Sequence, residues 1–424
     1  MTPEIKQRIE QIRRGEVPEG YVKKRKVVIP QQWGLPQIKD IASISSGSTP
    51  NRNNSEYWNG NIAWVTTGEL SSGHVNHTSE LITVKAVKET KMRIYPQGTL
   101  LMAMYGQGKT RGTVAILEID AAVNQACAAI TVKDGESKFL FYQLKNSYQD
   151  IRKLSNTGNQ ENLNADIIKT YQVPWAPDEE QERISTILTT QDKVIELKEK
   201  RLAEKQRQKK YLMQQLLTGK KRLPGFSGAW KNIKLCEVLS ERKEKNIEQN
   251  LRICSVAVQK GVIDQIEHLG RSYAASDTSN YSVAHYGDII YTKSPTGDFL
   301  YGIVKQNLLQ ETVAVSPLYG VFTPMTFGLG YFLYTYFQSA ICAQNYLLPI
   351  VQKGAKNTIN ITNDTFISSK LYLPLDVEEQ KAIADTFIAA DREIDLLRQD
   401  IEQEKQKKKA LMQLLLTGIV RVTV

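Results

Sequence analysis

The chain has 424 residues, of which 41% are hydrophobic and 24% are charged, as in soluble globular proteins with more than one domain. Its 55 Lys and Arg against 45 Asp and Glu give a net charge of +10, which is compatible with a nucleic-acid partner without requiring one. The four cysteines form no Cys-x-x-Cys pair, and the charged N-terminus lacks the apolar core of a signal peptide. We therefore expect a cytoplasmic protein with reduced thiols, no disulfide framework and no membrane partner.

Residues 1–29 form a distinct N-terminal segment. Residues 3–14 favour a short helix, and the basic run at residues 23–26 follows it. We expect that run to be a solvated arm. Residues 14–21 loosely resemble residues 218–226, which hints that the N-terminal piece completes a repeat begun at the C-terminus.

The chain contains an internal repeat of about 200 residues. Residues 179–184 (EEQERI) match residues 378–383 (EEQKAI), and residues 212–219 (LMQQLLTG) match residues 411–418 (LMQLLLTG). Both matches have the same offset of 199, so the roughly 40 residues between them align without a gap. The chain therefore carries two copies of one segment.

Each repeated segment predicts a long helix, within residues 178–222 and 377–424. Acidic residues occupy both first turns and lysines crowd both last turns, as the helix dipole favours. Gly219 and Gly418 stand where a C-terminal cap belongs. We expect the lysine-rich ends to be solvated faces.

A seven-residue period runs through both helices and indicates a coiled-coil spacer with mutual, antiparallel packing around a pseudo-twofold axis. Two amphipathic helices packed on separate cores are the alternative. The seam residues are Leu188, Ile195, Leu202 and Leu216 in the first copy and Phe387, Ile394, Ile401 and Leu415 in the second, with Lys209 and Lys408 interrupting both copies in register.

Upstream of each helix lies a globular segment, at residues 30–177 and 223–376. Trp33 and Trp230 open the two segments, and both mix short β-type runs with shorter helices. The expected strands lie at residues 62–66, 100–105, 113–117, 287–292, 301–304 and 311–315. Residues 312–352 carry no charge, and interrupting Pro and Gly favour a buried strand and helix over a membrane span. The predicted fold class is α+β, with two mixed domains separated by two long antiparallel helices.

One candidate DNA-contacting loop follows a strand in each domain. Residues 103–110 loosely fit a phosphate-binding loop, but a strand-like run follows where a helix is needed. We instead expect a β-hairpin that presents Gln107, Lys109 and Arg111, since Gln and Arg suit base edges and Lys suits phosphates. The second domain offers Lys293 and Thr296 in the corresponding region. A plain solvated loop is the alternative.

A second candidate DNA surface is a polar, glycine-containing loop before the last strand of each domain. Glycine and small amide residues let a backbone approach a ligand closely. The candidate residues are Asn159, Gln160 and Asn162 in the first domain and Lys353, Lys356 and Asn357 in the second. An ordinary turn is the competing interpretation.

No catalytic or metal site is predicted. No two prolines are adjacent, so the Asn/Asp-Pro-Pro-type signature of adenine methyltransferases is absent, and four histidines support no Ser/His/Asp triad. His74 and His77 have metal-like spacing but no nearby cysteine. We therefore predict a non-catalytic protein without a cofactor of its own.

Two divergent domains held by two similar helices suit the recognition of two different half-sites on duplex DNA. The order of domains and helices resembles the specificity subunit of type I restriction–modification systems. The resemblance covers residues 30–424 and rests on the Pro-x-x-x-x-Glu-Glu-Gln entry at residues 174–181, its shorter copy at 374–380, the exits at 212–219 and 411–418, and the linker at 223–228.

This resemblance implies a non-catalytic subunit in which two target-recognition domains bind a bipartite, asymmetric double-stranded DNA site. The helices would form the spacer and dock two methyltransferase subunits, and motor–nuclease restriction subunits would join the complex for phage defence. S-adenosylmethionine, ATP and Mg would then be cofactors of the partner subunits only.

Three alternatives remain open at this point. The first is the specificity subunit of a related, type IIB-like system. The second is a coiled-coil adaptor with two ligand-binding domains and no affinity for DNA. The third is a nucleotide-hydrolysing enzyme that uses Lys109.

Overall fold

The computed structural model describes residues 2–106, 108–154, 162–271, 274–353 and 359–422. The chain forms two compact units, residues 1–198 with 400–424 and residues 199–399. Each long helix therefore contributes one part to each unit. Within the described residues, no helix is long and apolar enough to cross a membrane.

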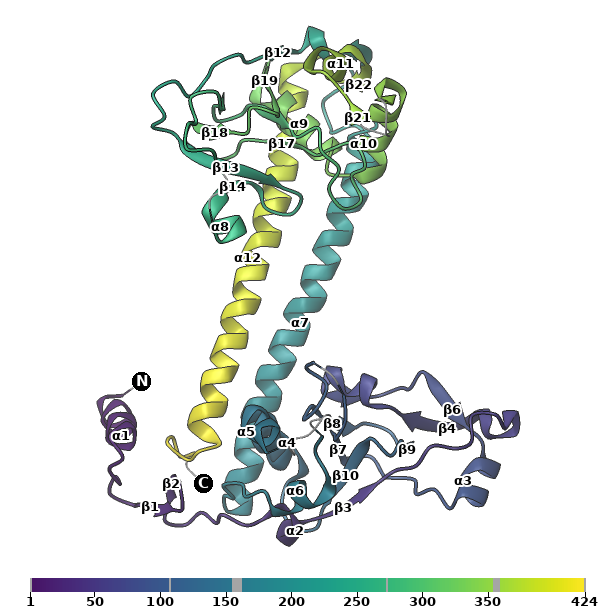
Figure 1. Ribbon diagram of the computed structural model, residues 1–424, viewed down its shortest axis with the longest axis vertical. Helices are drawn as coiled ribbons and strands as arrows, with labels where there is room; N and C mark the ends of the chain where they lie inside the picture. Colours follow the sequence, from purple (N-terminus) through teal and green to yellow (C-terminus); the bar gives the residue numbers. More distant parts are fainter. Residues whose placement is uncertain (1, 107, 155–161, 272–273, 354–358, 423–424) are drawn as a thin grey trace. The chain divides into compact units, whose positions relative to one another are not determined.

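Unit 1 contains the first domain, the N-terminal segment and parts of both long helices (Figure 1). Its helices are α1 (Pro3–Arg13), α2 (Ile38–Ile41), α3 (Val84–Thr90), α4 (Ser137–Asn146), α5 (Tyr148–Lys153), α6 (Ala165–Thr170) and the start of α7 (Asp178–Leu216). Its strands are β1 (Tyr21–Lys24), β2 (Val27–Pro30), β3 (Ala42–Ser46), β4 (Trp58–Val65), β5 (His74–Val75), β6 (Glu80–Ile82), β7 (Leu100–Ala103), β8 (Val114–Leu117), β9 (Ala121–Val123) and β10 (Cys127–Val132).

Unit 2 contains the second domain and the remaining parts of the long helices. Its helices are α8 (Gln265–Leu269), α9 (Phe327–Tyr336), α10 (Ala340–Leu347), α11 (Asn363–Ser368) and the start of α12 (Val377–Leu415). Its strands are β11 (Lys231–Lys234), β12 (Leu239–Glu241), β13 (Arg252–Ala257), β14 (Gly261–Asp264), β15 (Ser282–Ala284), β16 (Ile289–Tyr291), β17 (Val304–Gln306), β18 (Val313–Val315), β19 (Gly320–Pro324), β20 (Gln352–Lys353), β21 (Ile359–Asn360) and β22 (Lys370–Leu373).

The two domains share a common order of sheet strands although their sequences diverge, and the main sheet of unit 1 and the second sheet of unit 2 each carry one extra strand. The main sheet runs β3-β10-β7-β8-β5 in unit 1 and β12-β19-β16-β17 in unit 2. A second sheet runs β6-β4-β9 in unit 1 and β14-β13-β18-β15 in unit 2. In both second sheets the central strand pairs antiparallel to one neighbour and parallel to the other. The internal repeat therefore includes the globular domains as well as the helices.

Most of the predicted elements are confirmed, with shifted ends. The long helices begin at Asp178 and Val377 and stop three residues before the capping Gly219 and Gly418, which adopt positive φ of 68° and 70°. The charge-free stretch forms the buried β18 and β19 and the helices α9 and α10. The strand expected at residues 301–304 instead begins at Val304, because Gly302 adopts a positive φ of 97°.

The entry of each long helix carries a buried cluster that we call the Trp–Glu–Arg cluster. In unit 1 the carboxylate of Glu180, with no exposed surface, accepts a 2.9 Å hydrogen bond from Trp33 Nε1. Arg421 donates two further hydrogen bonds of 2.7 and 2.9 Å to the same carboxylate. The cluster therefore joins the start of the domain, the start of α7 and the chain that follows α12.

Unit 2 repeats the same cluster with equivalent residues. Glu379, whose side chain is 1% exposed, accepts a 3.1 Å hydrogen bond from Trp230 Nε1 and a bidentate pair from Arg222. Each cluster thus joins three repeated features of the sequence, namely the Glu-Glu-Gln motif, the opening tryptophan and the arginine after the Thr-Gly exit. Paired hydrogen bonds to a planar guanidinium make such a buried carboxylate tolerable.

The glutamine and glycine of the repeated motifs complete this packing. Gln181 Nε2 donates to the carbonyl of Ala176 at 2.7 Å, and Gln380 Nε2 donates to the carbonyl of Pro374 at 2.9 Å. A Cβ on Gly418 would lie 2.5 Å from Pro30. Any other residue at this exit would have to displace the N-terminal segment, which explains the glycine.

Removing either arginine should destabilise its unit. We expect Arg421→Met and Arg222→Met each to lower the free energy of unfolding by about 1–3 kcal/mol, because each leaves a buried carboxylate without its counter-ion. The measurement is urea unfolding followed by circular dichroism. Arg207→Met removes an ion pair to Glu204 whose arginine is 77% exposed, so it should cost at most about 0.5 kcal/mol. Equal effects of all three changes would contradict the structural role of the clusters.

Candidate nucleic-acid interface and paired helices

Within unit 1 the start of α7 runs antiparallel to the end of α12. Lys198 Nζ pairs with Asp400 and Glu404, both at 2.8 Å. Earlier in α7, Gln191 Nε2 donates to Glu404 Oε2 at 2.6 Å, and Asp192 forms an ion pair with Lys408. Residues further along α7 contact residues earlier in α12, which confirms the predicted antiparallel arrangement in this unit.

Within unit 2 the end of α7 pairs in the same way with the start of α12. Lys205 Nζ lies 2.9 Å from Glu393 Oε2, and Arg201 Nη2 lies 3.5 Å from Glu393 Oε1. One turn further along α7, Lys209 forms an ion pair with Asp391. Both units therefore hold their helices together by hydrogen-bonded ion pairs flanking the apolar seam.

Each unit contains a Lys–Asp–Tyr cluster where the helix pair meets its domain. Tyr142 of α4 donates a 2.8 Å hydrogen bond to Asp192, the partner of Lys408. Tyr331 of α9 donates a 3.0 Å hydrogen bond to Asp391, the partner of Lys209. Burial raises the pKa of both tyrosines above the ordinary value, so both hydroxyls remain donors to the aspartates.

These clusters correct the prediction of solvated lysines at the helix ends for two residues, whereas the neighbouring Lys210, Lys407 and Lys409 are exposed, as predicted. The Lys209 and Lys408 side chains are both only 12% exposed. The two lysines that interrupt the apolar seam are therefore ion-paired at its edge. Such a polar interruption can fix the register of paired helices, since a shifted register would leave the lysine without its aspartate.

Seven of the eight predicted seam residues are buried, in two different environments. Leu188 and Leu415 pack into the core of the first domain, and Leu216 and Phe387 pack into the core of the second. Ile195, Ile394 and Ile401 are buried outside these cores, at 8%, 4% and 5% exposed. Leu202 is partly exposed. Both predicted arrangements of the helices therefore occur. The ends of the helices pack on the domains, and the residues between the ends pack within the helix pairs.

The predicted β-hairpin loop of unit 1 lies between β7 and β8, which pair antiparallel. A hairpin connection in this place excludes a phosphate-binding loop, which must open a helix. Lys109 is exposed, as a phosphate contact requires. Gln107 lies outside the described residues.

Arg111 does not have the exposure that its predicted role requires. It is only 7% exposed, whereas a side chain that contacts base edges must reach out of the domain. Its contact with DNA stays a prediction, and its burial argues for a structural role. The apolar strand that follows at Val114 continues the sheet into the core, which explains why the end of the hairpin is covered.

The sequence analysis missed Arg152 of α5, which holds this hairpin in place. Arg152 Nη2 donates to the carbonyl of Gly108 at 2.8 Å, and Nη1 donates to the carbonyl of Arg111 at 2.7 Å. Tyr148 of the same helix donates to the carbonyl of Lys109 at 2.7 Å. No local pattern could reveal these contacts, because α5 lies about 40 residues from the loop in sequence.

The second predicted loop of unit 1 is described only at its last residue, Asn162, which lies beside the same hairpin. Leu163 N donates to the carbonyl of Met104 at 3.0 Å, directly after the end of β7. Asn162 is partly exposed at this point. Asn159 and Gln160 lie outside the described residues. The structure therefore brings Asn162 and the hairpin of Lys109 to one side of the sheet.

In unit 2 the equivalent hairpin connects β16 and β17. Thr296 is exposed in a tight turn, where its N–H and carbonyl both bond to Phe299 at 3.0 Å. Lys293 is half-buried with a positive φ of 57°, and burial lowers the pKa of its amine below the ordinary value. Thr296 is thus the more accessible of the two predicted contacts.

The remaining predicted residues of unit 2 cannot be placed as side chains. Lys353 closes β20, of which only the backbone is described, and Lys356 and Asn357 lie outside the described residues. The backbone of β20 pairs antiparallel with β21 on the far side of that segment. Among the described residues, no three His, Cys, Asp or Glu side chains gather into a metal-binding group.

Comparison with known proteins defines the class to which this architecture belongs. The family model described as type I restriction modification DNA specificity domain matches residues 30–207 and again residues 210–406. The chain therefore belongs to this family. The two matches coincide with the two repeats, and the chain is a non-catalytic specificity subunit, as predicted.

Two of the curated relatives come from Methanocaldococcus jannaschii. The MjaIX specificity subunit is 34% identical over 178 residues, which cover 41% of this chain and only 40% of that relative. The MjaVIII specificity subunit is 22% identical over 424 residues, covering 93% of this chain and 94% of that relative. The stronger similarity thus concerns less than half of either chain.

Two solved structures share the fold. A type I restriction–modification S subunit from M. genitalium superposes with a TM-score of 0.57 at 12% identity, covering 93% of this chain and 98% of that one. A structure described for the assembly and conformational transition of the type I system gives a TM-score of 0.54 at 15% identity, covering 92% and 99%. At these identities the likeness establishes the fold only.

The helix pair of unit 1 should be sensitive to acid through Glu404. Hydrogen bonds from Lys198 and Gln191 lower the pKa of this carboxyl from 4.5 to about 2. Because the folded state favours the ionised form, this stabilisation is present above pH 4.5 and is lost as the pH falls towards 2. We expect the difference in unfolding midpoint between the wild type and Glu404→Gln to narrow from pH 6 to pH 3. A difference in unfolding midpoint that does not change with pH would contradict a stabilising role of the ionised Glu404 carboxylate.

Proposed function

We propose that this chain binds a bipartite, asymmetric duplex DNA site, one half with each globular domain, and docks two methyltransferase subunits through its paired helices. The observation that carries the proposal is the duplicated frame. The two units share a common order of sheet strands, Trp–Glu–Arg clusters and Lys–Asp–Tyr clusters. The hairpins that each frame presents differ in sequence and length, as two different half-sites require.

Duplex DNA is supported as the ligand by the character of the hairpins. The loop of unit 1 offers the exposed Lys109 beside the partly exposed Asn162. Lysine suits phosphate oxygens, and amides suit base edges. Arg152 and Tyr148 hold the loop backbone from outside the loop, so its exposed residues can vary without loss of its position.

Two identical partners are supported by the equivalence of the helix pairs. Each unit combines one part of α7 with one part of α12 and presents the same ion-paired cluster, at Asp192 and at Asp391. A surface repeated in this way can bind two copies of one subunit. In the proposed complex, S-adenosylmethionine, ATP and Mg are bound by the methyltransferase and motor–nuclease partners rather than by this chain.

Binding of duplex DNA by the assembled methyltransferase complex tests the proposal through its salt dependence. We expect Lys109→Ala to weaken binding and to reduce the slope of log K against log salt by about 0.9, the value for one lost phosphate contact. The measurement is fluorescence anisotropy of a labelled duplex over a salt series. Lys39→Ala, an exposed lysine on α2 away from the hairpin, is the matched control and should leave the slope unchanged.

The substitution Arg111→Ala tests whether Arg111 has a structural role in the hairpin rather than a role as a DNA contact. Because Arg111 is buried, its removal should lower the unfolding midpoint of the chain and leave the salt slope unchanged. No affinity for any duplex in the wild-type complex would favour the adaptor alternative. An unchanged slope in Lys109→Ala would show that this hairpin does not contact phosphate.

A further inference from the structure

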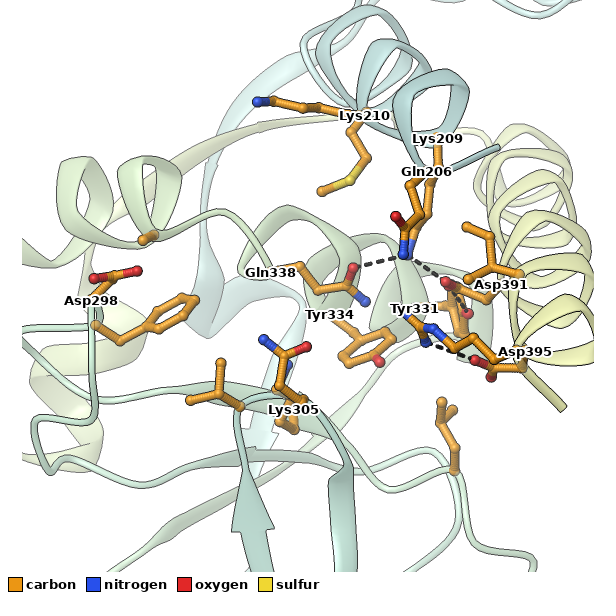
Figure 2. A pocket seen from close by; sticks show the side chains of 18 residues that line it. Gln206, Lys209, Lys210, Asp298, Lys305, Tyr331, Tyr334, Gln338, Asp391 and Asp395 are labelled. Carbon is orange, nitrogen blue, oxygen red and sulfur yellow. Dashed lines mark hydrogen bonds and ion pairs between the residues drawn. The ribbon is translucent and has the colours of Figure 1, made fainter. Parts of the chain in front are cut away.

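Unit 2 contains a cavity of about 540 Å³ where α7 and α12 meet the second domain. It is lined by residues of both helices, of α9 and of β17 (Figure 2). Its size falls within the range of small-molecule sites, which combine apolar walls with a few fixed polar groups. The Lys–Asp–Tyr cluster of unit 2 forms one of its walls.

Lys305 of β17 lines this cavity and is only 4% exposed. Its Nζ lies 5.4 Å from the centre of the Tyr334 ring, which lines the same cavity. Within the part of the chain that the structure describes, no carboxylate approaches this amine within ion-pair distance. A buried ammonium without a counter-ion is costly, and an anion in the cavity would offset that cost.

Two of the other cations around Lys305 are already paired, and Lys210, which also lines the cavity, is exposed. Lys209 pairs with Asp391 and donates a 2.9 Å hydrogen bond to Gln338 Oε1 (Figure 2). Arg398 pairs with Asp395 at 3.0 Å. Burial, with a further contribution from Lys209, lowers the pKa of Lys305 to about 8, and Asp391 opposes the shift. Among the described residues that line this cavity, Lys305 is therefore the buried cation without a paired anion.

The fold itself does not require this lysine. Lys305 pairs with Ile290 in the β16–β17 hairpin, and the equivalent position of unit 1 is Ala115, which pairs with Leu101. Ala115 is fully buried, and the Lys–Asp–Tyr cluster of unit 1 forms without any lysine there. At this strand position the lysine is specific to unit 2, although unit 1 also has a lysine, Lys145 of α4, whose pKa is lowered by desolvation and by the equivalent Lys408. The burial of Lys305 in the cavity without a counter-ion is therefore the observation that points to a ligand.

The remaining lining restricts the charge and shape of that ligand. Asp298, Asp391 and Asp395 also line the cavity, so a dianion would be repelled more strongly than a monoanion. Phe299, Leu308 and Met213 supply an apolar wall. A single carboxylate carried on an apolar or aromatic body matches both features.

We propose that the cavity of unit 2 binds a small organic carboxylate whose charge pairs with Lys305. This site adjoins the proposed DNA-contacting β16–β17 hairpin, because Asp298 and Phe299 of that hairpin line the cavity, and binding of a small carboxylate there goes beyond the proposed function. Its occupancy would add a contact between the second domain and the helix pair, because the ligand would touch residues of β17, α7 and α12 at once.

Benzoate is a suitable probe, with neutral benzamide as the matched control of the same shape and inorganic sulfate as the dianionic control. Lys305 reactivity is measured on the full chain at pH 7 by pulse acetylation with acetic anhydride and peptide mass spectrometry. An ion pair that raises the pKa of the amine by about one unit reduces its reactive neutral fraction about tenfold. We expect benzoate to slow acetylation of Lys305 by about this factor and to leave the exposed Lys260 unchanged.

A second measurement does not depend on the reactivity of the amine. Benzoate should raise the unfolding midpoint of the wild type, because it binds the folded state only, and should not raise that of Lys305→Met. Failure of benzoate to protect Lys305 at any concentration up to its solubility would overturn the proposal. Equal protection by benzamide would also overturn it, since the charge would then play no part, and stronger protection by sulfate would refute the assignment of a monoanion.

Discussion

Two buried carboxylates, Glu180 and Glu379, are the constraint on which the rest of the structure depends. Each is almost completely removed from water and is tolerated only because a tryptophan N–H and a bidentate arginine satisfy it. The partners come from the opening of the domain and from the segment after the opposite helix. A carboxylate that demands these partners therefore fixes where the domain starts, where the helix begins and where its companion ends.

This arrangement explains how one chain combines a nearly constant frame with divergent domains. The constant residues lie at the helix entries, at the glycine exits and in the Lys–Asp–Tyr clusters, all of which face the helix pair. The β7–β8 hairpin of unit 1 is instead held by Arg152 and Tyr148 of α5. Substitution in a hairpin can thus occur without disturbing the frame, which suits the proposed recognition of DNA by the hairpins.

Much of this frame was predictable because it occurs twice. The repeat at an offset of 199 is enough to locate both helices, their acidic starts and their capping glycines. The pairing of Glu180 with Arg421 was not predicted, since 241 residues separate them. The sequence did carry a sign of this pairing, because Trp33, Glu180 and Arg421 have counterparts in Trp230, Glu379 and Arg222, respectively. The recurrence alone does not show which of these residues touch.

The candidate DNA-contacting residues were less predictable for a physical reason. Residue type indicates what a side chain can bind, whereas exposure is set by packing around the loop. Lys109 and Arg111 lie two residues apart in one hairpin, yet the first is exposed and the second is buried. The same limitation applies to Lys209 and Lys408, where a lysine-rich sequence suggested solvent and the fold supplied an aspartate.

A genome-wide map of modified bases in the source organism tests most directly whether this chain selects the DNA target. The map is compared between strains in which the gene is intact, is deleted, or carries a foreign sequence in place of residues 42–170. We expect a split adenine-methylation motif that disappears on deletion. In the exchanged strain, one half of the motif should change while the other half is retained, because the Trp33 and Glu180 frame is left intact. A motif that persists after deletion, or that changes in both halves after the exchange, would contradict the proposed function.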